Sequence, residues 1–90
     1  MLKLSGETLS GKGQSGLDIG AIEYIGHEIS TIKELGCEIA IVIGGGNFIR
    51  GKDLAAIGID QASADSMGML ATMINSLALQ NVLEKLGMYT

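Results

Sequence analysis

The chain alternates short runs of consecutive apolar residues with longer segments in which apolar residues recur every three or four positions. The short runs, Met1 to Ser5 and Ile39 to Ile43, predict two strands, and the β-branched second run is typical of a strand buried on both faces of a parallel sheet. The longer segments, Asp18 to Leu35 and Ala64 to Leu86, predict two amphipathic helices. This order of strand, helix, strand and helix predicts an α/β fold.

The ends of the first helix carry ordinary capping signals. Asp18 is expected to act as the N-cap, and Gly36 is expected to end the helix in the left-handed conformation. The apolar stripe of this helix should comprise Ile22, Ile25, Ile29, Ile32 and Leu35. We therefore expect this helix to cover the sheet.

The second helix carries a wide apolar face and few charges. Residues 52 to 63 before it should form a connection that turns at Gly58 and Asp60. A helix this weakly charged is expected to pack on the sheet with one side and on another element or subunit with the other. Its apolar face should comprise Met67, Leu70, Ala71, Ile74, Leu77, Ala78 and Val82.

Glycines and cationic residues lie where the two strands end. Parallel strands joined by one helix end at the same edge of a sheet, so Lys3 and Gly6 should lie beside Gly44 to Gly46. A glycine run can bring backbone N–H groups against an anion, and Arg50 adds a planar set of donors that matches phosphate oxygens. The pattern predicts a phosphate site, with a solvent-facing strand lysine as the alternative for Lys3.

Two familiar phosphate motifs are nearly matched in the glycine-rich segment before the first helix, and both fail. Gly6 to Lys12 spells G-x-x-x-x-G-K, but Gly13 stands where Ser or Thr must bind Mg²⁺. Gly11 to Gly16 spells G-x-G-x-x-G, but five residues separate it from the first strand. A flexible loop is the simpler interpretation.

Three other polar or reactive residues have both a structural and a functional interpretation. Asp65 is expected in the first turn of the second helix, as a cap or as an acceptor for a ribose hydroxyl. His27 is expected on the solvent side of the first helix, and Cys37 is expected to pack beside the buried strand. The single cysteine excludes an internal disulfide and a cysteine-based zinc site.

Composition narrows the class of protein. The 90 residues are 47% hydrophobic but only 3% aromatic and lack proline, which is typical of the inside of a larger α/β domain. A strand pattern begins directly at Met1 and another begins at Met88 to Thr90, so we expect residues 1–90 to be the amino-terminal part of one domain, a fragment.

A net charge of −4 without a basic cluster argues against nucleic acid as a partner. No apolar run reaches the roughly 18 residues of a membrane span, so a soluble cytoplasmic protein is expected.

Three motifs resemble a known family. They are KLSGE at Lys3 to Glu7, IGGGNFIRG at Ile43 to Gly51, and ADSMGMLATMINSLALQNVLE at Ala64 to Glu84. In order and spacing they resemble the amino-terminal part of the bacterial uridylate kinases (UMP kinases), a branch of the amino acid kinase family. The third motif discriminates best, because acetylglutamate, aspartate and carbamate kinases share the glycine strand.

The resemblance implies a three-layer α/β/α sandwich with a mainly parallel sheet, of which this chain holds the first βαβα portion. It also implies a homo-hexamer that transfers the γ-phosphoryl group of ATP to UMP with Mg²⁺, giving UDP and ADP for pyrimidine nucleotide biosynthesis. The 90 residues alone are expected to be inactive.

The resemblance also implies roles for the matched residues. The pair expected to act in phosphoryl transfer is Lys3 and Arg50. The residues expected around the phosphates of ATP are Lys3, Leu4, Ser5, Gly6, Gly46 and Arg50. Those expected to hold UMP are Gly45 and Asp65, and none is assigned to a metal. The segment that corresponds to a GTP effector region comprises Gly11, Lys12, Gly13, Gln14, Ser15 and Gly16.

The sequence also has three alternative interpretations. A kinase of the same family acting on an acyl or carbamoyl acceptor would share the glycine strand. A non-catalytic relative that stores oxoanions would share the fold. An interaction module made only of this chain would neither transfer phosphoryl groups nor store oxoanions.

Overall fold

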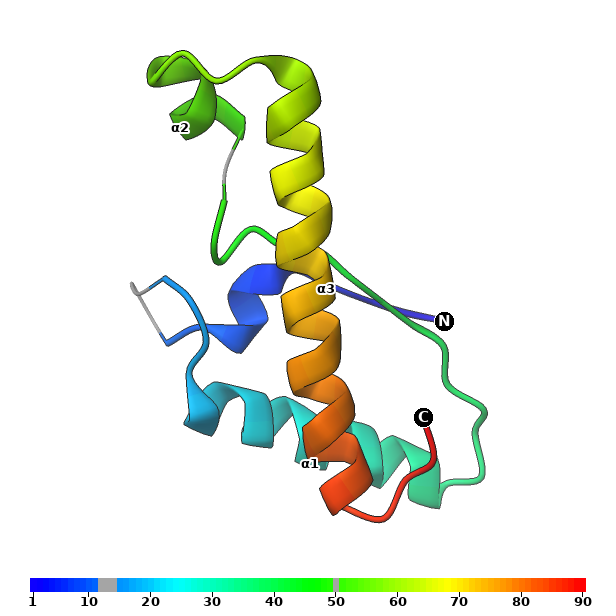
Figure 1. Ribbon diagram of the computed structural model, residues 1–90. Coiled ribbons are helices and arrows are strands. Elements are labelled where there is room, and N and C mark those ends of the chain that lie inside the picture. The colour runs from blue at the N-terminus through cyan, green and yellow to red at the C-terminus, as the bar shows by residue number, and fades with distance from the viewer. Residues whose placement is uncertain (12–14, 50) are drawn as a thin grey trace.

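The protein is built around a short parallel sheet and two long helices that pack on one of its faces. The computed structural model describes residues 1–11, 15–49 and 51–90, with only the backbone for Gly51 and Lys52. Figure 1 shows the last helix running the length of the molecule and the first crossing it near one end. The elements are β1 (Leu2–Leu4), the 3-10 helix η1 (Gly6–Leu9), α1 (Ile19–Glu34), β2 (Ile41–Ile43), α2 (Gly51–Ala56) and α3 (Gln61–Lys85).

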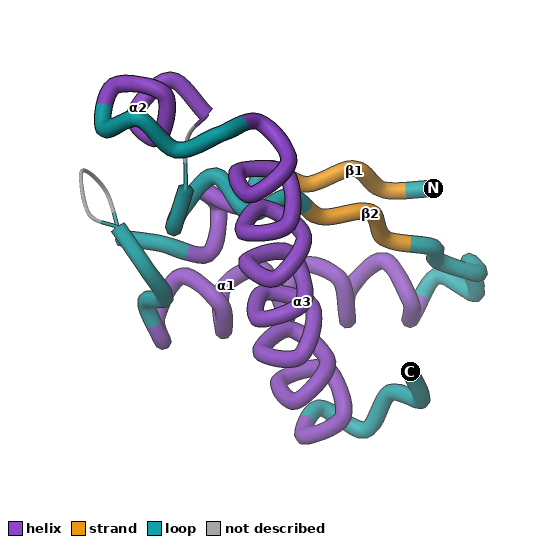
Figure 2. The backbone as a smooth tube through the Cα atoms, turned by 45° about the horizontal axis from the view of Figure 1, so that its top comes forward, coloured by secondary structure: helices purple, strands orange, loops and turns teal. Residues whose placement is uncertain are grey.

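The strands β1 and β2 lie side by side and parallel, as predicted (Figure 2). Lys3 pairs with Val42, so both side chains leave the same face of the sheet. The expectation that the second strand is buried on both faces was wrong. Ile43 is 8% exposed but Val42 is 48% exposed, because the described helices cover only the face that carries Ile43.

The core lies between the sheet, η1, α1 and α3. At Gly26 a Cβ atom would stand 2.6 Å from Cγ1 of Val82, so the glycine lets α1 and α3 approach closely. Ile32 and Leu35, expected in the stripe of α1, are exposed instead, because they lie beyond the point where α3 crosses. The buried residues of this core are Leu9, Ile22, Ile29, Ile43, Leu79 and Leu83.

The predicted caps of α1 are confirmed. The Asp18 carboxylate accepts a hydrogen bond from the Ala21 N–H at 2.8 Å. Gly36 has φ of +86°, and its N–H donates to the Lys33 carbonyl at 3.0 Å. Both ends of the helix are therefore set by local sequence.

The connection before α3 differs from the prediction. Residues 51–56 form the short helix α2, and α3 begins at Gln61, three residues before the expected start. Asp60 is the N-cap of α3, where it accepts from the Ser63 N–H at 3.0 Å and from the Ser63 hydroxyl at 2.9 Å. Asp65 consequently lies beyond the first turn, and its predicted capping role was wrong.

The apolar face predicted for α3 is rotated from the one that packs. Leu70, Ile74 and Leu77 are 62%, 46% and 56% exposed. The buried side chains recur every four residues and include one amide, which lies outside the predicted apolar face. They are Ala71, Asn75, Leu79 and Leu83.

Much apolar surface is uncovered in this chain. Its radius of gyration is 14.3 Å, against about 12 Å for a compact domain of the same length. Its accessible surface is 6118 Å², against roughly 5000 Å² for a compact protein of this mass. The exposed side chains form an apolar face on α3 that comprises Met69, Leu70, Met73, Ile74 and Leu77. Within the described residues, no helix combines the length and hydropathy that a membrane crossing requires.

The cap of α3 leads to a prediction about pH. The Ser63 backbone N–H, which donates to the Asp60 carboxylate, lowers the pKa of Asp60 from its ordinary 3.8. Stability from this depressed pKa is fully present above pH 3.8 and is lost as pH falls through the lower pKa of the folded state. Asp60→Ala should therefore lower the thermal midpoint at neutral pH, by an amount that shrinks as pH falls below 3.8.

Thermal unfolding followed by circular dichroism from neutral to acidic pH measures this difference. Asp53→Ala is the control, since Asp53 is an exposed carboxylate in α2. An Asp60→Ala deficit that stays constant across the whole pH range would contradict the proposed ionic cap.

Candidate functional site

The end of β1 lies directly against the glycine turn that follows β2. A Cβ atom at Gly6 would stand 2.5 Å from the Gly44 carbonyl oxygen and 2.8 Å from the Gly46 nitrogen. The Gly44 N–H donates to the Leu4 carbonyl at 3.2 Å, which extends the ladder by one residue. The predicted neighbourhood of the first strand's end and the glycines is therefore present.

Two backbone N–H groups of the glycine turn have no partner among the residues that the structure describes. The Gly45 carbonyl accepts from the N–H groups of Phe48 and Ile49, at 3.0 and 3.2 Å. Among residues 1–11, 15–49 and 51–90, none accepts a hydrogen bond from the N–H of Gly45 or Gly46. Successive free amides in a turn form a concavity suited to an anion.

A buried pair of asparagines, Asn47 and Asn75, holds this turn from its core side. The amide of Asn47 donates to Oδ1 of Asn75 at 3.0 Å, and the amide of Asn75 donates to Oδ1 of Asn47 at 2.7 Å. Each also reaches a backbone carbonyl, Asn47 that of Gly16 at 2.9 Å and Asn75 that of Gly44 at 2.7 Å. A buried amide that lost its partner would cost about 1–3 kcal/mol, so the pair is held firmly.

Sequence reasoning missed Asn75. It is 0% exposed although it is an amide in the middle of a helix. The available signal was its position four residues after Ala71 and four before Leu79, inside the buried stripe of α3. A polar residue at such a position must find internal partners.

The residues at the end of β1 divide between surface and core. Lys3 and Ser5 are exposed, and Leu4 turns its partly buried side chain to the core. The Ser5 hydroxyl caps η1 by accepting from the Glu7 N–H at 3.3 Å. The segment from Gly6, expected to be a flexible loop, begins as this 3-10 helix.

Asp65 lies on the same side of α3 as the glycine turn. The Gly68 carbonyl stands 3.2 Å from the place a Cβ atom would take at Gly45, and Asp65 precedes Gly68 by one helical turn. Its Oδ1 accepts from the Gln61 side chain at 2.8 Å, and the side chain is exposed. Gly45 and Asp65, the two residues that the resemblance assigns to UMP, thus lie on two segments that contact each other.

Part of the predicted site falls outside the described residues. Arg50 and, in the expected effector segment, Lys12, Gly13 and Gln14 lie there. Of the rest of that segment, Gly11 and Ser15 lie in a connection. Gly16 has φ of +79°, and its N–H donates to the Asn47 carbonyl at 2.8 Å.

The remaining reactive side chains lie away from this site. His27 is exposed on α1, as predicted. Cys37 was expected to pack beside the strand but is exposed, because β2 starts only at Ile41 and Cys37 belongs to the connection.

Comparison with known proteins identifies the family. The profile of the amino acid kinase family matches residues 1–90. The chain belongs to the amino acid kinase family. Similar members include the uridylate kinase of Rickettsia typhi, 53% identical over the whole of this chain and 37% of the relative's length. The uridylate kinase of Xanthomonas axonopodis pv. citri is 53% identical over 97% of this chain and 36% of the relative.

Solved structures of the family agree with the fold. The UMP kinase of Ureaplasma parvum superposes with a TM-score of 0.90 at 38% identity, covering 99% of this chain and 39% of that one. The UMP kinase of Bacillus anthracis gives 0.86 at 44% identity, covering 93% and 34%. The chain thus spans little more than a third of the relatives it matches, and its two parallel strands and packed helices agree with the predicted α/β fold.

Proposed function

We propose that the protein is a UMP kinase that transfers the γ-phosphoryl group of ATP to UMP, giving UDP and ADP. The observation that carries the proposal is the meeting of Gly6 with the glycine turn, whose Gly45 and Gly46 amides have no acceptor within the described part of the chain and could bind phosphate. The names and structures of the relatives support the choice of nucleotides. An enzyme acting on these nucleotides is expected to work in the cytoplasm.

The chemistry requires two anions to approach each other in line. Positioning and neutralisation of charge on the transferring phosphoryl group account for most of the catalysis in such reactions. Lys3 would supply positive charge beside the turn, and the N–H groups of Gly45 and Gly46 would bind phosphate oxygens. Arg50, matched by sequence, would add a second cation. Gly6 and Gly46 would line the ATP phosphates, and Gly45 would contact UMP.

When bound together with ATP, Mg²⁺ would neutralise negative charge on the phosphates. Within the described part of the chain, no three His, Cys, Asp or Glu side chains gather to hold a metal. The donors present at the turn are amides, which suit phosphate oxygens and not the cation. The residues of the turn therefore fit the nucleotide. Mg²⁺ would come to the turn together with the phosphates of the nucleotide.

The direct test is an acceptor comparison with the complete protein encoded by the reading frame that contains this chain. ATP consumption should require UMP and should not respond to N-acetylglutamate, aspartate or carbamate. Turnover with one of those acceptors would assign a different kinase of the family. Tight loading of molybdate or tungstate without UMP-dependent turnover would favour the oxoanion-storage alternative. Assembly as a hexamer and a GTP effector belong to the same proposal and are tested by sedimentation and by added GTP.

The position of Asp65 leads to a prediction about the acceptor. If its carboxylate accepts a ribose hydroxyl of UMP, Asp65→Asn should raise the KM for UMP about tenfold, because a neutral acceptor then replaces a charged one and the hydrogen bond is weaker. The KM for ATP should change little. Steady-state kinetics of the complete protein measure both constants.

Asp53→Asn, in the exposed short helix α2, is the matched control and should alter neither constant. An unaltered KM for UMP in Asp65→Asn would remove Asp65 from the acceptor site.

A further inference from the structure

The asparagine pair is oriented by the groups around it. The carbonyls of Gly16 and Gly44 can only accept hydrogen bonds, so the NH₂ group of each asparagine must face its carbonyl. Asn47 is 4% exposed and Asn75 is 0% exposed. Both NH₂ groups make two hydrogen bonds each, within 2.7 to 3.0 Å. The arrangement therefore has one orientation only.

The pair fixes the direction of a peptide group in the glycine turn. In a trans peptide the C=O of one residue and the N–H of the next point in opposite directions. The Gly44 carbonyl is turned inward to the Asn75 amide, so the Gly45 N–H points away from Asn75, towards the exposed side of the turn. Glycines without such a restraint would sample many conformations.

We propose that Asn75, acting with Asn47, is a positioning residue that aims the amides of the glycine turn at a bound phosphate. Because Asn75 is 0% exposed, it acts on a ligand through the groups that it holds, the Gly44 peptide and the Asn47 side chain. This inference rests on the proposed function, because it assigns the amides to nucleotide phosphates. It also predicts that the segment at Gly16 is coupled to the glycine turn. The Asn47 carbonyl accepts from the Gly16 N–H, and the Asn47 side chain donates to the Gly16 carbonyl.

The test is Asn75→Ala in the complete protein, assayed well below its unfolding temperature. The kcat for UMP-dependent ATP turnover should fall about tenfold, because amides that are no longer aimed stabilise the transition state less. Amide hydrogen exchange should accelerate at Gly16, Phe48 and Ile49, whose N–H groups are protected by this turn. Exchange in the middle of α1 should not change.

Two further variants sharpen the result. Asn81→Ala removes an exposed asparagine whose amide donates to the Leu77 carbonyl of its own helix, and it should change neither kcat nor exchange at the turn. Asn47→Ala keeps the Asn75 bond to Gly44, so its effect on exchange should be larger at Gly16 than at Phe48. This variant supplies the test if Asn75→Ala does not fold.

Two results would overturn the proposal. One is an Asn75→Ala protein with unchanged kcat and unchanged exchange at Phe48 and Ile49. The other is faster exchange spread equally over α1, the sheet and the turn, which loss of stability alone would produce. If the unsubstituted protein shows no UMP-dependent turnover, the proposed function fails, while the exchange comparison still decides whether Asn75 orders the turn.

Discussion

Lys3→Ala should lower the kcat of the complete protein by about a hundredfold or more, with UMP binding retained. The physical reason is that negative charge on the transferring phosphoryl group needs a cation beside the free amides of the glycine turn. Lys3 is the middle residue of β1, three residues before Gly6, which meets that turn. Its side chain is exposed, so its removal should not unfold the protein.

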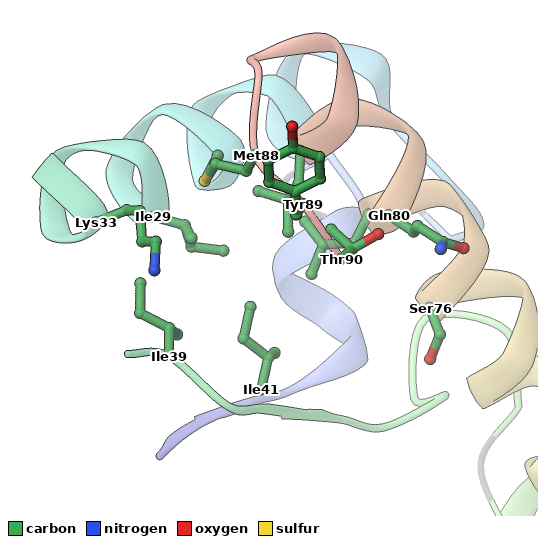
Figure 3. A pocket seen from close by; sticks show the side chains of 11 residues that line it. Ile29, Lys33, Ile39, Ile41, Ser76, Gln80, Met88, Tyr89 and Thr90 are labelled. Carbon is green, nitrogen blue, oxygen red and sulfur yellow. The ribbon is translucent and has the colours of Figure 1, made fainter. Parts of the chain in front are cut away.

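Single-turnover phosphoryl transfer and equilibrium binding of UMP separate the two effects. Lys33→Ala is the control, because Lys33 is also an exposed lysine and donates to the Cys37 carbonyl at 3.4 Å, before the amino end of β2. It lines an apolar pocket of about 270 Å³ together with Ile29 and Ile39 (Figure 3). Unchanged turnover in Lys3→Ala would remove Lys3 from the chemistry.

Gly6→Ala should destabilise the protein and abolish nucleotide binding. The new methyl group would meet backbone atoms, the Gly44 carbonyl oxygen at 2.5 Å and the Gly46 nitrogen at 2.8 Å. Neither can rotate away as a side chain would, so β1 and the glycine turn must separate. Overpacking of this kind costs about 1–3 kcal/mol, and the separation also disperses the proposed phosphate site.

Gly44→Ala is the matched control within the same glycine run. The nearest atom to its new methyl group would be the Gly6 nitrogen, at 4.0 Å, so stability should be kept. Thermal unfolding and ATP binding of the two variants measure the contrast. Equal midpoints for Gly6→Ala and Gly44→Ala would show that the two chain segments are not in the contact described here.

Local sequence and the order of the elements along the chain predicted part of the fold. The caps at Asp18 and Gly36, the parallel pairing and the approach of Gly6 to the glycine turn were all derived from pattern and connectivity. Each follows from backbone geometry that a few residues determine. The resemblance supplied the family, which the comparisons confirm.

Features that depend on packing could not be predicted in the same way. Apolar residues occupy most of the circumference of α3, so hydrophobic spacing alone did not show which side faces the core. The side that packs contains Asn75, and its partners Asn47 and Gly44 are distant in sequence. The exposure of Val42 depends on which face of the sheet is covered, and one chain's pattern of apolar residues carries no record of that.

The roles of the site residues remain predictions, with different support from geometry. Gly6, Gly45 and Gly46 lie where a close backbone approach, and two amides without an acceptor among the described residues, make a phosphate site physically reasonable. Asp65 lies on the adjoining side of α3. Arg50 lies outside the described residues, so its role depends on the sequence match alone.

The asparagine pair also sets an order of events when the protein is made. Asn47 and Gly16 are 31 residues apart, and so are Asn75 and Gly44. Ribosomes add about 5–20 residues per second. Asn75 is therefore synthesised roughly 2–6 seconds after Gly44, and the glycine run lacks its hydrogen bond to Asn75 during that time. Until Asn75 has been synthesised, the nascent chain contains the residues of the turn but lacks the side chain that orients its amides. We therefore expect the turn to bind a nucleotide only after that point.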